Sequence, residues 1–260
     1  MSYNNPEKPV LSPGEHIEPL GEGRALIVNE IHRFGTDAFL LASFTSPRRR
    51  EACVDLGTGC GIIPALWVSD GCGKSVLGID ISEEACSLAR RSVEMNGDSD
   101  IVSIRNIDLR RLAESDIPRE AFHCVACNPP YFVESSGYVA PDPERAAARC
   151  ERSCSIDDVL DAAKYLLRYG GRLCMCHRPE RLADVICSMR SHGIEPKRLR
   201  LVHQKPGSKP WLVLIEGKRG GASSLEMLPP LNMLDPDGNS SDEIESMYAE
   251  YRKNAGYTKD

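Results

Sequence analysis

The segment VDLGTGCGIIPAL, residues 54–66, constrains the fold more than any other part of this 260-residue chain. A short apolar run that contains Asp55 gives way to Gly57, Gly59 and Gly61, and apolar residues resume directly afterwards. This pattern predicts a buried strand, a tight turn whose glycines let the backbone approach a ligand closely, and a helix. Such a turn is typical of α/β folds that bind ligands at the carboxyl edge of a parallel sheet.

The glycine turn departs from two common phosphate-binding patterns. A dinucleotide fingerprint would place its last glycine at position 62, where this chain has Ile62. A P-loop would end in Lys followed by Ser or Thr, and neither follows the last glycine here. The turn therefore favours a ligand that does not present a pyrophosphate to it.

Strand-like and helix-like segments alternate from about residue 51 to residue 203. This alternation predicts a Rossmann-like α/β fold, in which helices cover both faces of a seven-stranded, mostly parallel sheet. The last two strands, separated by QKPGSK, predict an antiparallel hairpin at the edge of the sheet. The predicted strands are 51–56, 75–80, 101–108, 121–128, 172–177, 197–203 and 210–217, and the predicted helices are 82–96, 156–169 and 179–192.

Two segments flank this core. Residues 1–46 are expected to form a small hairpin around 17–28 and a short helix at 37–46 that pack on the core and cover a cofactor. Residues 47–219 are expected to form the cofactor-binding domain. Residues 220–260 hold eight acidic and three basic residues and form an acidic extension, part of which is expected to be helical.

Three acidic residues lie at or near the ends of the first three predicted strands. A carboxylate at Asp55 suits a ligand that carries an ammonium group, Asp80 can bind both hydroxyls of a ribose, and Asp108 lies in reach of an adenine amino group. An amino acid, a ribose and an adenine together make up S-adenosylmethionine. Each Asp taken alone is equally typical of a helix cap, so the inference depends on all three in this order.

The stretch CNPPYF places an amide, two prolines and an aromatic ring directly after the fourth strand. If the Asn128 side-chain oxygen and the Pro129 carbonyl accept both hydrogens of an adenine amino group, the nitrogen lone pair is free to attack a methyl sulfonium. Pro129 and Pro130 hold that carbonyl in place, and Tyr131 can stack on the base. These four residues are the predicted catalytic group, and the alternative is a simple turn at the end of a strand.

Together, DLGTGCG, GIDIS and NPPY resemble the motifs of the class I S-adenosylmethionine-dependent methyltransferases. The resemblance covers about residues 30–216 and implies the fold of that class. It implies that Ile81 joins Asp80 in cofactor binding and that Asn128 contacts the cofactor as well as the acceptor. NPPY points to transfer onto an amide or exocyclic amine nitrogen.

The segments HRFGTDAFLLASF, NPPYF and PERAAARCE are similar to those of the bacterial valine-tRNA adenine-N6 methyltransferases. That family methylates the adenosine 3′ of the anticodon, at position 37. The resemblance implies that Arg145 and Arg149 contact RNA phosphates, although Cys150 stands where family members often have His. It also implies a cover over the cofactor made of Phe34, Gly35, Thr36 and Asp37.

The formal net charge of the chain is −6, but one segment of it is basic. Between residues 190 and 219 there are eight Arg or Lys residues and two Glu residues, whereas the extension alone contributes −5. Local basic surface is what binds phosphates, so RNA contacts are expected there. The candidates are Lys197, Arg198, Lys205 and Lys209.

Three alternatives to tRNA methylation are compatible with the motifs. Glutamine N5-methyltransferases of release factors share NPPY, but they carry a helical substrate domain, and only about 50 residues precede the core here. Methylation of a ribosomal RNA base is a related alternative. A non-catalytic RNA-binding protein is the third, and the intact acidic residues and Asn128 argue against it.

The remaining composition indicates a cytoplasmic protein. No apolar run is long enough to span a membrane, and the first residues lack the pattern of a secretory signal.

The 11 cysteines are expected to be unpaired. A metal is not expected, because Cys124 and Cys127 lie three apart on a predicted strand and face opposite sides. The oligomeric state is left open.

Overall fold

The computed structural model describes residues 9–21, 23–129 and 154–254. Four predicted site residues lie outside these ranges, namely Pro130, Tyr131, Arg145 and Arg149.

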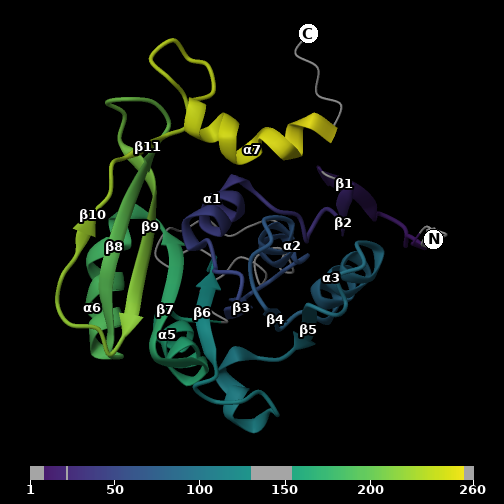
Figure 1. Ribbon diagram of the computed structural model, residues 1–260, viewed down its shortest axis with the longest axis horizontal. Helices are drawn as coiled ribbons and strands as arrows, with labels where there is room; N and C mark the ends of the chain where they lie inside the picture. Colours follow the sequence, from purple (N-terminus) through teal and green to yellow (C-terminus); the bar gives the residue numbers. More distant parts are fainter. Residues whose placement is uncertain (1–8, 22, 130–153, 255–260) are drawn as a thin grey trace, which may run out of the picture.

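The core is a nine-stranded sheet with the order β10-β8-β9-β7-β6-β3-β4-β5, and β11 also pairs with β8 (Figure 1). β3 to β7 are mutually parallel, whereas β9 runs antiparallel to both β7 and β8. The strands are β3 (Ala52–Leu56), β4 (Ser75–Asp80), β5 (Val102–Asn106), β6 (Phe122–Cys127), β7 (Leu167–His177), β8 (Ile194–His203), β9 (Pro210–Arg219), β10 (Glu226–Met227) and β11 (Leu231–Asn232).

The predicted fold class and the antiparallel edge are confirmed, but the count of seven strands is wrong. The two extra strands, β10 and β11, come from the acidic extension and pair in parallel with the outer side of β8. Each contains two residues, which is too short for an alternating pattern to be visible in the sequence.

Helices cover both faces of the sheet, as expected. One buried cluster joins it to α1, α2, α3 and α7, and the other joins it to α5 and α6. Cys124 belongs to the first cluster and Cys127 to the second, so these two residues of β6 do face opposite sides. The helices are α1 (Thr36–Thr45), α2 (Ile62–Ser69), α3 (Glu83–Met95), α5 (Ile156–Leu166), α6 (Leu182–Ser191) and α7 (Asp242–Asn254), with 3-10 turns η1 (Leu109–Glu114) and η3 (Pro179–Arg181).

Two of the predicted helix starts are confirmed by their caps, whereas in the third predicted helix residues 179–181 form the 3-10 turn η3 and α6 begins only at Leu182, without a side-chain cap. The Ser82 hydroxyl accepts a hydrogen bond from the Ala85 amide at 3.2 Å. Ser155 and Asp158 form a reciprocal capping box at the start of α5. The predicted end of this helix is wrong, because α5 stops three residues early and Leu167 is buried in β7, where it pairs with Phe122.

The flanking segments pack on the core. β1 (His16–Gly21) and β2 (Arg24–Val28) form the expected hairpin, and the buried Ser92 hydroxyl of α3 accepts a hydrogen bond from the Ile27 amide at 2.8 Å. Asn96 holds both the amide and the carbonyl of Ala25. At the other terminus, α7 crosses over α1 toward β1 (Figure 1).

Candidate active site

A cavity of about 530 Å³ opens at the carboxyl edge of the parallel strands. Most of the predicted cofactor residues meet there although they are distant in sequence. The lining includes Phe34, Gly35, Asp37, Asp55, Gly57, Gly59, Asp80, Ile81, Asp108, Asn128 and Pro129.

Two predicted cofactor residues do not line this cavity. Thr36 is exposed at the first position of α1. Gly61 is the N-cap of α2 with φ of +86°, and a Cβ at this position would lie 3.2 Å from the Cβ of Ala89. Gly61 thus permits the turn and its close packing on α3 rather than touching the cavity.

Asp55 is a buried acidic residue of the cavity whose side chain lacks hydrogen-bond partners among the described residues. Its side chain is buried on β3, and neither carboxylate oxygen has a hydrogen-bond partner among the described residues. The Thr58 hydroxyl of the glycine turn is also buried and lacks a partner within the same ranges. Burial raises the pKa of Asp55 to about 8, the nearby Thr58 hydroxyl opposes this rise although it does not reach hydrogen-bond geometry, and the charge of Asp80 acts in the same direction as burial. A cationic ligand would meet the requirement of this carboxylate.

Asp80 is fixed by the backbone of the site. Its Oδ2 accepts a hydrogen bond from the Gly59 amide at 2.8 Å, and its Oδ1 accepts one from the Ser82 amide at 2.9 Å. Each carboxylate oxygen retains acceptor capacity, as recognition of two hydroxyls requires. The neighbouring Ile81 has 58% of its surface exposed, which offers an apolar surface to the face of a planar ring.

Asp108 is held by a neighbouring arginine. Arg110 donates hydrogen bonds from Nε and Nη2 to its carboxylate, the shortest of them 2.6 Å long, and these bonds lower the pKa of Asp108. The carboxylate lines the cavity but is already paired. Its contact with an adenine amino group stays a prediction, because such a contact shares the carboxylate with Arg110.

The described part of the NPPY motif follows β6 directly. Asn128 and Pro129 line the cavity, and the Asn128 Oδ1 accepts a hydrogen bond from the Cys176 thiol with a distance of 3.1 Å. This contact from β7 orients the amide oxygen at the edge where Asp55 and Asp80 also lie. The predicted catalytic roles stay predictions.

The four basic residues proposed for RNA fall into two groups. Lys197 donates to the Ala222 carbonyl and the Ser224 hydroxyl, and Arg198 forms an ion pair with Glu216 at 2.7 Å, so both are engaged inside the protein. Lys205 and Lys209 are exposed in the turn between β8 and β9. Because β8 runs parallel to β7, this turn lies at the same carboxyl edge as the cavity.

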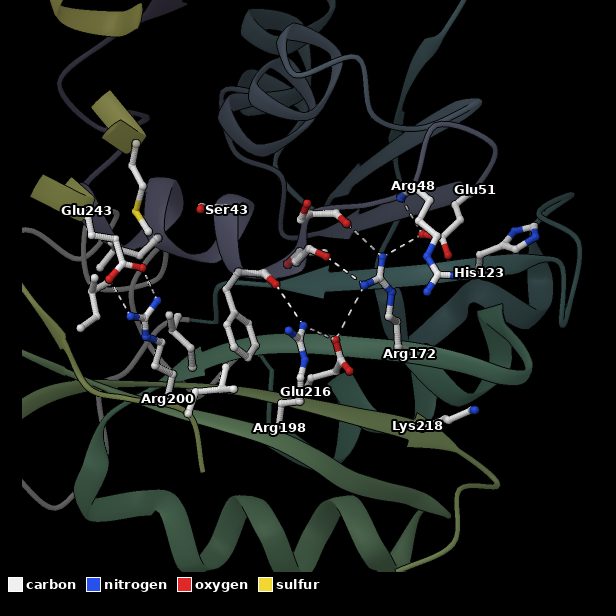
Figure 2. Close-up of a pocket in the computed structure, with 18 of the residues that line it drawn as sticks. Ser43, Arg48, Glu51, His123, Arg172, Arg198, Arg200, Glu216, Lys218 and Glu243 are labelled. Atoms are coloured by element: carbon white, nitrogen blue, oxygen red, sulfur yellow. Dashed lines mark hydrogen bonds and ion pairs between the residues drawn. The ribbon is translucent and has the colours of Figure 1, made fainter. Parts of the chain in front are cut away.

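A second and larger cavity of about 780 Å³ lies beside the end of α1, over β7, β9 and β8 (Figure 2). It is called the ion-pair groove here, because paired charges line it. Arg172 contacts Glu51 at 2.7 Å and Glu216 at 3.7 Å, and Arg200 contacts Glu243 at 2.6 Å. Figure 2 shows these side chains pointing toward one another across the groove.

Within the described ranges, no three His, Cys, Asp or Glu side chains form a group that could hold a metal ion. In the same part of the chain, no helix combines the length and apolar character needed to cross a bilayer.

Sequence reasoning missed part of the wall of the cavity. Ile107 and Leu109 line it on either side of Asp108, and Thr58 contributes its buried hydroxyl. Each of them is the immediate neighbour of Asp108 or of the glycines of the turn, and that position is the signal that could have identified it. Cys154 and Val159 also line the cavity, but no motif marks them.

The comparisons with known proteins agree with this architecture. Residues 33–142 match the methyltransferase small domain family. A solved structure from Agrobacterium tumefaciens, described as a predicted O-methyltransferase, superposes with a TM-score of 0.66 at 23% identity and covers 83% of this chain and 97% of its own. A geranyl diphosphate methyltransferase has a TM-score of 0.51 at 17% identity and covers 70% of this chain and 84% of its own. The fold is that of the S-adenosylmethionine-dependent methyltransferases.

Curated relatives of similar sequence identify the family within this class of methyltransferases to which the chain belongs. The tRNA1(Val) (adenine(37)-N6)-methyltransferase of Porphyromonas gingivalis is 30% identical over 189 residues, which cover 71% of this chain and 73% of the relative. The enzyme of the same name from Tolumonas auensis is 26% identical over 196 residues, which cover 75% of this chain and 79% of the relative. This chain belongs to the family of tRNA1(Val) (adenine(37)-N6)-methyltransferases.

Proposed function

We propose that this protein transfers a methyl group from S-adenosylmethionine to the N6 amino group of adenosine 37 in a valine tRNA. The observation that carries the proposal is the single cavity that holds Asp55 and Asp80 together with Asn128. Among the described residues the buried Asp55 carboxyl group has no hydrogen-bond partner, Asp80 offers two acceptor oxygens, and Asn128 follows β6 at the same edge.

The chain fits the cofactor at three points. Asp55 holds the ammonium group of the methionine part, because a buried carboxylate without a partner is stabilised by a cation. Asp80 binds the ribose hydroxyls, and Ile81 packs against the adenine ring. Phe34, Gly35 and Asp37 cover the cofactor from the start of α1. When bound, the cofactor supplies an electrophilic methyl group.

The acceptor amine is activated by Asn128 and Pro129. The Asn128 Oδ1 and the Pro129 carbonyl accept the two amino hydrogens, so the nitrogen turns its lone pair toward the methyl group. Fixed acceptors stabilise the positive charge that develops on the nitrogen without having to reorganise. Proton loss follows methylation, because the nitrogen becomes acidic only as the new bond forms.

The RNA is held at the same edge of the sheet. A base of the anticodon loop must leave its stack to enter the cavity, which costs a few kcal/mol at most in a single-stranded loop. Lys205 and Lys209 bind flanking phosphates, and Arg145 and Arg149, outside the described residues, are the other candidates. Because the proposed substrate is a tRNA, we propose that the protein acts in the cytoplasm.

The test is methyl transfer from labelled S-adenosylmethionine to bulk tRNA from a strain that lacks this protein, followed by nucleoside separation. We expect label in N6-methyladenosine and a loss of about 100-fold or more in kcat for Asn128→Ala, as for other fixed polar groups of active sites.

The double variant Lys205→Glu and Lys209→Glu is expected to weaken RNA binding and to reduce its salt dependence.

Other outcomes have definite meanings. Label on a glutamine of a release factor, with none on RNA, would move the assignment to the protein-methylating alternative. Label in N6-methyladenosine of ribosomal RNA alone would retain the chemistry and change the substrate. Cofactor binding without transfer to any acceptor would leave a non-catalytic protein with this fold.

A further inference from the structure

We infer that the C-terminal helix α7 positions the cover of the cofactor cavity through a row of three aromatic rings in contact, and that Tyr248 is the positioning residue. This inference rests on the proposed function in one respect, because it takes the cavity to be the binding site of S-adenosylmethionine.

The three rings connect parts of the chain that are more than 200 residues apart in sequence. The Tyr248 ring of α7 stacks on Phe39 of α1 with centroids 4.7 Å apart and planes at 30°. Phe39 meets Phe34 edge to face, with centroids 5.7 Å apart and planes at 60°. Both geometries are favourable for aromatic pairs. Phe34 lines the cofactor cavity, so the row of rings ends at the site itself.

The first turn of α7 is anchored independently of these rings. Arg200 donates two hydrogen bonds to Glu243, 2.6 and 2.7 Å long, and a third to the Pro229 carbonyl. Ile244 is 3% exposed in the same buried cluster as α1. Ile244 and Tyr248 are four residues apart, so they lie on the same face of the helix and turn Tyr248 toward α1. Figure 2 shows Arg200 and Glu243 meeting at one end of the ion-pair groove.

The cover, residues 34–37, makes few contacts within itself that would fix its position. Gly35 is the N-cap of α1 and supplies no side-chain cap, and both Gly35 and Thr36 are exposed. Asp37 is half-buried, and the one hydrogen bond of its carboxylate within the described residues comes from the adjacent Ala38 amide. The Phe34 ring is therefore the part of the cover that packs on the protein, and Phe39 holds it from the side where Tyr248 lies.

The test compares cofactor binding among variants of the full chain, with S-adenosylhomocysteine as the titrated ligand and no RNA present. Tyr248→Leu keeps an apolar side chain on α7 and removes the ring, and we expect binding about three- to tenfold weaker. Tyr248→Phe keeps the ring and is expected to stay within about twofold of the unmodified protein. In turnover assays, Tyr248→Leu raises KM for the cofactor and leaves kcat at saturating cofactor unchanged.

Glu243→Gln is the matched control on the same helix, because it weakens an anchor and leaves all three rings in place. We expect it to bind S-adenosylhomocysteine within about twofold of the unmodified protein. Phe39→Leu removes the middle ring from α1 without changing α7, and the same weakening as for Tyr248→Leu is expected. Amide exchange at residues 34–38 should accelerate in both Leu variants and not in the control.

Two results would overturn the inference: equal binding by Tyr248→Leu and the unmodified protein, or equal weakening in Tyr248→Leu and Glu243→Gln. An unmodified protein that fails to bind S-adenosylhomocysteine would instead reject the cofactor assignment, and the inference with it. Binding by the unmodified protein without methyl transfer to RNA rejects only the proposed reaction, because the variants are compared by binding.

Discussion

The cofactor cavity and the ion-pair groove lie at opposite ends of α1, and they differ in how their charges are satisfied. In the groove, Arg172, Arg198 and Arg200 each meet a glutamate. In the cavity, the buried Asp55 meets no partner among the described residues. The groove is the larger of the two, at about 780 Å³ against about 530 Å³. A ligand-binding cavity therefore differs from a structural groove in its buried polar groups without hydrogen-bond partners, and not in its volume.

Two of the paired arginines of the groove also stabilise the carboxyl end of α1. α1 has no basic residue in its last turn, so its own sequence does not neutralise the negative end of the helix dipole. Arg172 donates to the Thr45 carbonyl at 3.0 Å, and Arg198 donates to the Phe44 carbonyl at 3.3 Å. The sheet therefore supplies the positive charge that the end of α1 lacks.

The largest expected effect is a loss of stability from the groove. Glu216→Gln removes the carboxylate shared by Arg172 and Arg198, whose charges then face each other across a partly buried site. We expect the free energy of unfolding in urea to fall by about 3 kcal/mol. Affinity for S-adenosylhomocysteine should stay unchanged, and a clear loss of affinity would show that the two cavities are not separate in function.

A smaller effect is expected in the cofactor cavity, with the opposite sign for stability. Asp55→Asn removes the acceptor for the cofactor ammonium group, and binding should weaken by about 2 kcal/mol, or roughly 30-fold. The ligand-free variant should be more stable than the unmodified protein at pH 8, because a buried carboxylate no longer has to ionise without a partner. Calorimetric titration and thermal unfolding measure the two changes, and a variant that binds normally would remove Asp55 from the site.

The same carboxylate predicts a dependence on pH. Its pKa is about 8 in the folded protein, against an ordinary value of 3.8, so between these values the native state holds one more proton than the unfolded state. The contribution of Asp55 to the free energy of unfolding therefore decreases as pH rises from about 4 to about 8. An ammonium ligand favours the ionised form, so cofactor affinity should rise with pH and level off near 8.

Titrations in two buffers with different ionisation enthalpies would detect the proton that is released on binding below that pH. Asp55→Asn serves as the control and should release none. Equal proton release by both proteins would assign the titration to another group.

The smallest effect is expected at the exposed end of the groove. The side chains of Arg200 and Glu243 are 17% and 46% exposed, so solvent screens the ion pair that anchors α7. Glu243→Gln should lower the free energy of unfolding by no more than about 1 kcal/mol. A loss as large as that of Glu216→Gln would mean that the exposed pair carries as much of the fold as the shared carboxylate.

Features with a local cause could be predicted from the sequence. The strand, glycine turn and helix around Asp55 follow from residues that are adjacent in the chain, and so do the caps at Ser82 and Ser155. The convergence of Asp55, Asp80 and Asn128 followed from one topological rule, because carboxyl ends of parallel strands share an edge.

Features that depend on distant partners could not be predicted. The sequence gives no sign that Lys197 bonds to the extension or that Arg198 is neutralised by Glu216, because each partner lies on another strand or segment. The end of α5 was missed for a similar reason, since pairing of Leu167 with Phe122 overrides a local helical pattern. The contact of Tyr248 with Phe39 depends on where the extension folds back.

The short strands β10 and β11 have a consequence for how copies of this protein behave toward one another. They occupy stretches of the outer side of β8, a strand of ten residues that would otherwise end the sheet with free amide and carbonyl groups. A bare strand of that length is a template for pairing with another chain. Since β10 and β11 cover stretches of this edge, we expect a chain cut before residue 226 to aggregate more readily than the unmodified protein.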